Sequence, residues 1–345
     1  MDTVAEAPIA RRSRLVAEVD WDADGVQHGF VRLFHSTHAS AYGFIPIPVV
    51  VIRNGAGPTA LFTGGTHGDE YEGQVALAKL ARWLKPEMMR GRVIIMPQTN
   101  HPAAVAGLRV SPLDDVNLNR VFPGDANGSV TQQIAFFIEH EVIPRADLVC
   151  DLHSGGSSLN YVPTALMKRS DDAAYFARGL AALRAFGAPL AYVALGAQGQ
   201  GADQTLSGGG ERRGIIALGS ELGGGGTVNP SALRIAERGL RNLLVHLEML
   251  PDSFRESGEP TRVLEVGGAD YFVYAPEPGV CEPLVELGDT VRSGQPAALV
   301  HTPETPWREP TEVRFARDGF VLCKRIPGRT VRGDCLFHLG TDWHE

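Results

Sequence analysis

Three residues from two distant parts of the chain are the candidate ligands of a metal site. His67 and Glu70 belong to the segment His67-Gly68-Asp69-Glu70, and His153 follows much later. An imidazole and a carboxylate at this spacing can converge on one cation where a loop turns into a helix. Two histidines and one glutamate, with a fourth position left open, are typical of a catalytic zinc site. The alternative is a surface His-Asp-Glu cluster and a separate polar turn at His153.

Glu221 is a candidate proton acceptor. It follows an apolar run and precedes Leu222 and four consecutive glycines, 223–226. A carboxylate at a strand end beside a metal can take a proton from water, and consecutive glycines let the backbone lie close to a ligand. The alternative is a solvated glutamate before a flexible loop.

A third candidate group contains arginine and asparagine. Arg120 closes the segment Asn117-Leu118-Asn119-Arg120, and Arg109 lies upstream of it. The planar guanidinium suits carboxylates, and asparagine adds a donor. An arginine salt bridge on a loop is the alternative interpretation.

The candidates follow segments that alternate between strand and helix patterns. Helices are expected over 70–84, 131–143 and 173–186, and another begins at Asn229-Pro230, where asparagine suits the N-cap and proline the first turn. Strands are expected at 30–34, 48–52, 60–63, 92–96, 147–152 and 215–220. This alternation predicts an α/β layered fold with a mostly parallel sheet. Ligand sites in such folds lie beyond the carboxyl ends of the strands.

Composition excludes several classes of protein. The 345 residues are 43% hydrophobic and carry a net charge of −8, which argues against a disordered chain and against a nucleic-acid binder. No apolar run approaches the roughly 18 residues of a membrane helix, and the first residues lack the pattern of a secretory signal. Four cysteines without C-x-x-C spacing predict reduced thiols and a cytoplasmic protein. A small-molecule partner is expected.

Four motifs in this order resemble the succinylglutamate desuccinylase/aspartoacylase family, which shares its fold with zinc carboxypeptidases. They are G-G-T-H-G-D-E at 64–70, N-L-N-R at 117–120, D-L-H-S-G-G at 151–156 and E-L-G-G-G-G at 221–226. The resemblance covers roughly residues 40–340. It implies a three-layer α/β/α domain with a mixed, mostly parallel sheet, and one zinc ion per chain.

The resemblance also implies a role for each candidate. His67, Glu70 and His153 correspond to the zinc ligands, and Glu221 to the general base. Asn119 and Arg120 correspond to the clamp on the α-carboxylate of the substrate, and Arg109 to the group that polarises the scissile carbonyl.

The implied activity is hydrolysis of an N-acylated amino acid. Segments 25–30, 67–73 and 221–227 are most similar to the N-α-acetyl-L-2,4-diaminobutyrate deacetylases of ectoine breakdown. Segment 196–213 is less similar and is expected to border the substrate pocket. A deacylase of the aspartoacylase or desuccinylase type, a peptidase and a non-catalytic ligand-binding relative are the alternatives.

A change of pattern near residue 251 predicts two domains. Residues 1–255 form the deacylase domain, which begins with a β segment at 1–58. Residues 256–345 form a β domain that resembles a biotinyl/lipoyl-type barrel. Its single lysine, Lys324, lies in an apolar segment, which is unfavourable for a carrier tether. This domain is expected to shield the mouth of the active site or to support a homo-oligomer.

Overall fold

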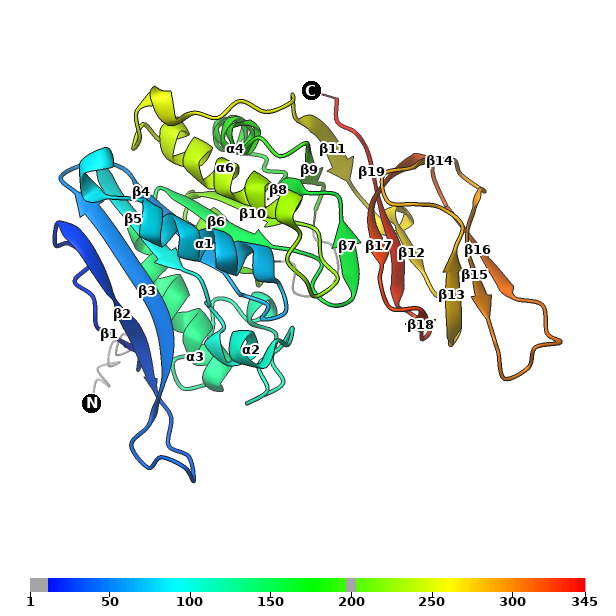
Figure 1. The fold of residues 1–345 in the computed structure, drawn as a ribbon, viewed down its shortest axis with the longest axis horizontal. Helices are drawn as coiled ribbons and strands as arrows, with labels where there is room; N and C mark the ends of the chain where they lie inside the picture. The colour runs from blue at the N-terminus through cyan, green and yellow to red at the C-terminus, as the bar shows by residue number, and fades with distance from the viewer. Residues whose placement is uncertain (1–11, 197–202, 345) are drawn as a thin grey trace, which may run out of the picture.

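The computed structural model describes residues 12–196 and 203–344. In these residues, 15 strands form one mixed sheet that extends from the N-terminal hairpin to the C-terminal region (Figure 1). Its strands are β1 (Val16–Ala17), β2 (Gly25–Phe34), β3 (Phe44–Asn54), β4 (Thr59–Gly64), β5 (Gly91–Met96), β6 (Leu148–His153), β7 (Leu159–Tyr161), β8 (Thr164–Lys168), β9 (Leu190–Ala194), β10 (Ile216–Glu221), β11 (Arg262–Val266), β12 (Phe272–Tyr274), β14 (Thr290–Val291), β17 (Gly319–Arg325) and β19 (Cys335–Asp342). A four-stranded sheet contains β13 (Gly279–Pro283), β15 (Pro296–His301), β16 (Thr311–Arg314) and β18 (Arg329–Thr330).

The centre of the large sheet is parallel. Strands β5, β4, β6 and β10 are neighbours in that order, and each pair is parallel. Strands β3 and β8 flank this block and pair with it in antiparallel fashion. The carboxyl ends of β4, β6 and β10 therefore meet at one edge of the sheet, as the parallel pattern predicts.

Helices cover both faces of the sheet, so the predicted three-layer α/β/α fold is confirmed. They are α1 (Tyr71–Trp83), α2 (His101–Ala106), α3 (Val130–Phe137), α4 (Ala173–Phe186), α5 (Leu206–Glu211) and α6 (Pro230–His246). Helices α1 and α6 contact each other across one face, and α4 packs beside α6 (Figure 1). Their core includes Phe62 and Ile95, whereas the adjacent residues Leu61 and Ile94 belong to the core under α3. Successive side chains of a strand point to opposite faces, which explains why these strands are apolar throughout.

The ends of the helices follow their local sequence. The Asn229 side chain accepts hydrogen bonds from the backbone amides of Ser231 and Ala232, so the predicted N-cap of α6 is confirmed. The helix expected over 131–143 differs, because the regular α-helix ends at Phe137 and a π-helical turn continues over Ile138–Val142. The last backbone hydrogen bond of this π-helical turn runs from the Ile143 amide to the Ile138 carbonyl. The next residue, Pro144, has no amide hydrogen with which to continue the pattern.

The C-terminal region is attached to the sheet through β11, which pairs with β9 on one side and β19 on the other. The domain division after residue 255 stays a prediction. Lys324 lies within β17 and forms an ion pair with Glu286 at 2.7 Å, so its ammonium is already engaged. No helix in the described ranges is long and apolar enough to cross a membrane.

Candidate metal centre

The three predicted metal ligands lie at or just beyond the carboxyl ends of two neighbouring parallel strands, β4 and β6. His67 lies in the loop after β4, Glu70 is the N-cap of α1, and His153 is the last residue of β6. The loop packs tightly, because a Cβ at position 68 would lie 2.0 Å from the carbonyl carbon of Ala103 in α2. Only glycine fits between His67 and Glu70 at this point.

Glu70 joins the two imidazoles. His67 Nδ1 lies 2.7 Å from Glu70 Oε1, and His153 Nδ1 lies 2.8 Å from Glu70 Oε2. One ligand atom from each of the three residues lies within 4.8 Å of the others, and all three residues are buried. The Glu70 side chain makes no capping bond to α1, so its carboxylate remains directed at the histidines. The predicted convergence on one point is therefore present.

A second set of side chains orients the imidazoles. The Asn117 Oδ1 atom lies 3.1 Å from His67 Nε2, and Asp151 Oδ2 lies 2.7 Å from His153 Nε2. The hydroxyls of Thr63 and Thr66 donate to Asp151 Oδ1 at 2.7 and 2.8 Å. Ligating histidines in zinc proteins are oriented through their second ring nitrogen in this way. The donor set and its supports therefore fit a zinc ion bound by the Nδ1 atoms and the Glu70 carboxylate.

The electrostatics of the cluster favour a cation. Burial raises the pKa of Glu70, but the charges and hydrogen bonds of His67 and His153 outweigh it and hold this pKa well below its usual range. Burial lowers the pKa of His153, but Asp151 and Glu70 outweigh it and raise this pKa well above its usual value. The carboxylates of Asp151 and Glu70 thus favour a positive charge at His153, which a proton supplies in the metal-free protein and a bound cation would supply in its place.

Glu221 lies beside the cluster. It is the last residue of β10 and pairs in register with His153 on β6. Burial, followed by the negative charge of Glu70, raises its pKa to about 8. Its Oε2 atom is buried and has no hydrogen-bond partner among the residues described. A buried carboxylate oxygen without a partner is costly, which is typical of a functional site.

Both predicted arginines lie near the cluster. Arg109 donates from Nη1 to Glu70 Oε1 at 3.2 Å, although its side chain is 45% exposed. Arg120 donates to the Asn119 carbonyl at 2.7 Å. Desolvation of its guanidinium, followed by the positive charge of Arg109, lowers the pKa of Arg120. Two adjacent guanidiniums beside the cluster form a surface suited to an anionic ligand.

Asn119 is directed at the cluster as well. Its Nδ2 lies 3.2 Å from His153 Nε2, and its Oδ1 accepts the backbone amide of Leu206 at 2.9 Å. Leu206 belongs to segment 196–213, so the second half of that segment contacts the candidate site, whereas residues 197–202 lie outside the described residues. The Leu206 amide thus fixes the Asn119 side chain beside His153. The predicted role of Asn119 as a substrate clamp stays a prediction.

The sequence alone assigns no supporting role to Asp151, Thr63, Thr66 or Asn117, although Asn117 belongs to the candidate segment 117–120. Asp151 and His153 are two residues apart on one strand, so they share a face of the sheet. This spacing is the signal that could have identified Asp151. The threonines contact it only because β4 pairs with β6.

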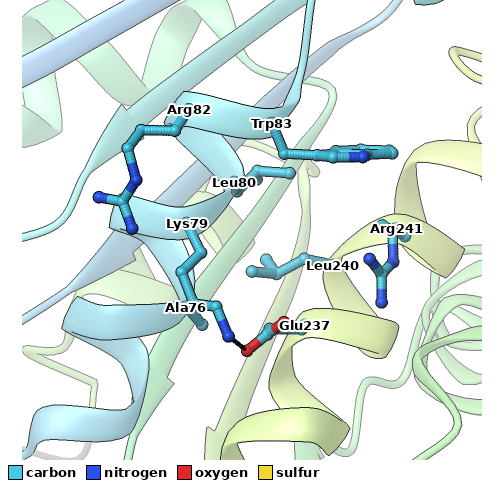
Figure 2. Close-up of a pocket in the computed structure, with 8 residues that line it drawn as sticks. All are labelled: Ala76, Lys79, Leu80, Arg82, Trp83, Glu237, Leu240 and Arg241. Carbon is cyan, nitrogen blue, oxygen red and sulfur yellow. Dashed lines mark hydrogen bonds and ion pairs between the residues drawn. The ribbon is translucent and has the colours of Figure 1, made fainter.

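A separate groove of 350 Å³ lies between α1 and α6 on the surface of the helical layer (Figure 2). Its lining includes Trp83 and an ion pair between Lys79 and Glu237. None of the candidate site residues lines this groove, so we do not assign the chemistry to it.

Comparison with known proteins agrees with this geometry. The family model for the succinylglutamate desuccinylase/aspartoacylase catalytic domain matches residues 56–247. The chain belongs to this family. It is 44% identical over 326 residues to the N-alpha-acetyl-L-2,4-diaminobutyric acid deacetylase of Halomonas elongata, covering 94% of each chain.

Two solved structures have the same fold over nearly their whole length. One is a succinylglutamatedesuccinylase/aspartoacylase from Rhodobacter sphaeroides, and the other is the product-bound ectoine utilization protein EutE (DoeB) from Ruegeria pomeroyi. Each is 40% identical, has a TM-score of 0.91 and covers 96% of this chain and 100% of its own. The family assignment made from the four motifs is therefore confirmed.

Proposed function

We propose that this protein is a zinc-dependent deacetylase that hydrolyses N-α-acetyl-L-2,4-diaminobutyrate to acetate and L-2,4-diaminobutyrate, a reaction of ectoine breakdown. The observation that carries the proposal is the convergence of His67, Glu70 and His153 within 4.8 Å. The 44% identity to the Halomonas elongata enzyme supports the choice of substrate.

His67, Glu70 and His153 would hold the zinc ion. When bound, zinc acts as a Lewis acid that lowers the pKa of water towards about 7 and polarises a carbonyl oxygen. Asp151 and Asn117 keep the two imidazoles oriented through their Nε2 atoms. Because these supports are buried or hydrogen-bonded, the ligands need little rearrangement when the ion binds.

Glu221 moves the proton in the reaction. Its unpartnered Oε2 takes a proton from the water that attacks the acetyl carbonyl carbon. As the carbon–nitrogen bond breaks, the same carboxyl gives that proton to the leaving amine. Water and amide thus yield acetate and a free amino acid with no other reactant.

The two arginines bind the negative charges of the substrate. Arg109 reaches the cluster at Glu70 and is placed to donate to the oxygen of the scissile carbonyl as charge develops there. Arg120 lies next to it and is suited to the α-carboxylate.

We also place the reaction in the cytoplasm, because all four cysteines, which fall within the described ranges, are free thiols.

The second candidate is a deacylase for another acyl amino acid, as the family name itself suggests. Product analysis separates the two. The purified protein is incubated with N-α-acetyl-L-2,4-diaminobutyrate, N-acetylaspartate or N-succinylglutamate, with and without a chelator. We expect acetate from the first compound, loss of activity with the chelator and recovery with added zinc. Faster release of acetate from N-acetylaspartate, or of succinate from N-succinylglutamate, would contradict the proposed substrate.

A further inference from the structure

An aromatic cluster lies next to Glu221 and has no role in the mechanism described above. Its centre is His338 on β19, which is 4% exposed. The imidazole stacks on Phe272 with ring centroids 4.5 Å apart and meets the rings of Tyr161 and Tyr192 edge-on at 6.0 and 5.8 Å. Neither ring nitrogen of His338 has a hydrogen-bond partner in the part of the chain that the structure describes.

Strand pairing assembles this cluster from distant segments. Tyr161 pairs with Cys323, Cys323 with His338, and His338 with Phe272, so these four residues form one row across β7, β17, β19 and β12. Side chains in one row of a sheet point to the same face. The row packs against Tyr192 of β9.

The same pairing connects the cluster to the metal centre. Glu221 pairs with Thr164, and Thr164 pairs with Leu190. Tyr192 lies two residues after Leu190 and therefore shares the face of the sheet on which Glu221 lies. On the other side, the Tyr161 amide donates to the carbonyl of Gly223, two residues beyond Glu221, at 3.0 Å.

The chemistry of the cluster suits an ammonium group. Tyr161 and Tyr192 are half-buried, so each keeps part of its surface accessible. Burial lowers the pKa of His338 to about 3, so the ring is neutral and one nitrogen is a free acceptor. Burial raises the pKa of both phenols, which therefore stay neutral, and Glu221 contributes in the same direction. Aromatic faces attract cations, and a buried unpaired nitrogen needs a donor.

We propose that Tyr161, Tyr192 and His338 form the subsite that binds the side-chain ammonium of the substrate. The tyrosine rings contact the cation, and the free nitrogen of His338 accepts a hydrogen bond from it. Phe272, which stacks on the imidazole, holds it in place. This inference rests on the proposed function and extends it, because it says which residues distinguish an N-acetylated diamino acid from an N-acetylated neutral amino acid.

The test compares two substrates that differ only in the ammonium group, N-α-acetyl-L-2,4-diaminobutyrate and N-acetyl-L-2-aminobutyrate, on the zinc-loaded enzyme. Tyr192→Leu and His338→Phe should each raise KM for the first substrate about tenfold more than they raise KM for the second. Tyr192→Phe, which keeps the ring, is the matched control and should stay within about threefold of wild type. Equal losses on both substrates would show a structural role only and would overturn the subsite, as would unchanged KM values.

A binding experiment separates failure of the subsite from failure of the proposed function. Calorimetry on the zinc-loaded protein should show tighter binding of L-2,4-diaminobutyrate than of L-2-aminobutyrate, and His338→Phe should remove the difference. If the wild type hydrolyses neither acetyl compound, the proposed function fails, while this preference still supports the subsite. Equal binding of the two amino acids by wild type overturns the subsite even if deacetylation is observed.

Discussion

Asp151 should control how tightly this protein holds zinc, although it is not one of the proposed ligands. Its carboxylate is fully buried and lies 2.7 Å from His153 Nε2. In Asp151→Asn, the remaining carbonyl oxygen can still accept from Thr63 and Thr66, but the negative charge facing His153 is lost. The substitution therefore weakens the orientation and basicity of His153 while it keeps the volume of the side chain.

The expected loss of zinc affinity follows from the contact between Asp151 and His153. Loss of an outer-shell partner typically lowers metal affinity by about 10- to 100-fold, which corresponds to about 1.4 to 2.8 kcal/mol. Because Asp151 is buried and water cannot replace its charge, we expect a loss near the upper end of this range. The zinc Kd is measured by competition with a chelating dye at constant pH.

Asp147→Asn is the matched control. Asp147 precedes the first residue of the same strand, at the end opposite His153, and its carboxylate accepts the Thr59 amide at 2.7 Å. This variant should bind zinc as wild type does. Urea denaturation of the metal-free proteins shows whether Asp151→Asn is folded. A folded Asp151→Asn protein with a zinc Kd within twofold of wild type would refute the argument that this carboxylate supports His153.

Three further predictions concern catalysis, packing and pH. Glu221→Gln should keep its zinc content, measured by elemental analysis, and lose about 10²- to 10⁴-fold in kcat; a zinc-loaded variant with wild-type kcat would remove Glu221 from the proton-transfer role. Gly73→Ala should lower the free energy of unfolding by about 1 to 3 kcal/mol in urea denaturation, because the added Cβ would lie 2.7 Å from Leu152 Cβ, whereas Gly328→Ala meets no atom within 4 Å and should be neutral. Burial raises the pKa of Asp114, but hydrogen bonds from Thr131 outweigh it and lower this pKa in the folded protein. Its stabilising contribution should therefore be complete above the unfolded value of about 3.9 and disappear as pH falls through the lower folded value. Urea denaturation at several pH values should show Asp114→Asn less stable than wild type at pH 7 with a gap that closes in acid, and a gap independent of pH would contradict this.

The local sequence was sufficient to predict those parts of the structure that depend on residues close together in the chain. The apolar runs of β4, β5, β6 and β10 and the N-cap of α6 were recognisable because strand burial and helix capping involve residues a few positions apart. The alternation of these strands with helices predicted the parallel arrangement. The strands β7, β8 and β9 were not predicted, because they have only three to five residues and β7 and β8 carry polar residues that interrupt an apolar run.

The residue types at the candidate centre were determined by the sequence itself, because two histidines, a glutamate and a glycine-rich loop after Glu221 can be recognised without coordinates. Only the tertiary structure brought His153 to Glu70 and put Asp151 behind His153, since these contacts depend on the pairing of β4 with β6. The approach of His338 to Tyr161 and Tyr192 depends in the same way on the C-terminal strands. No periodicity along the chain encodes such contacts, because they are stabilised by burial and backbone pairing between segments that the linear sequence keeps far apart.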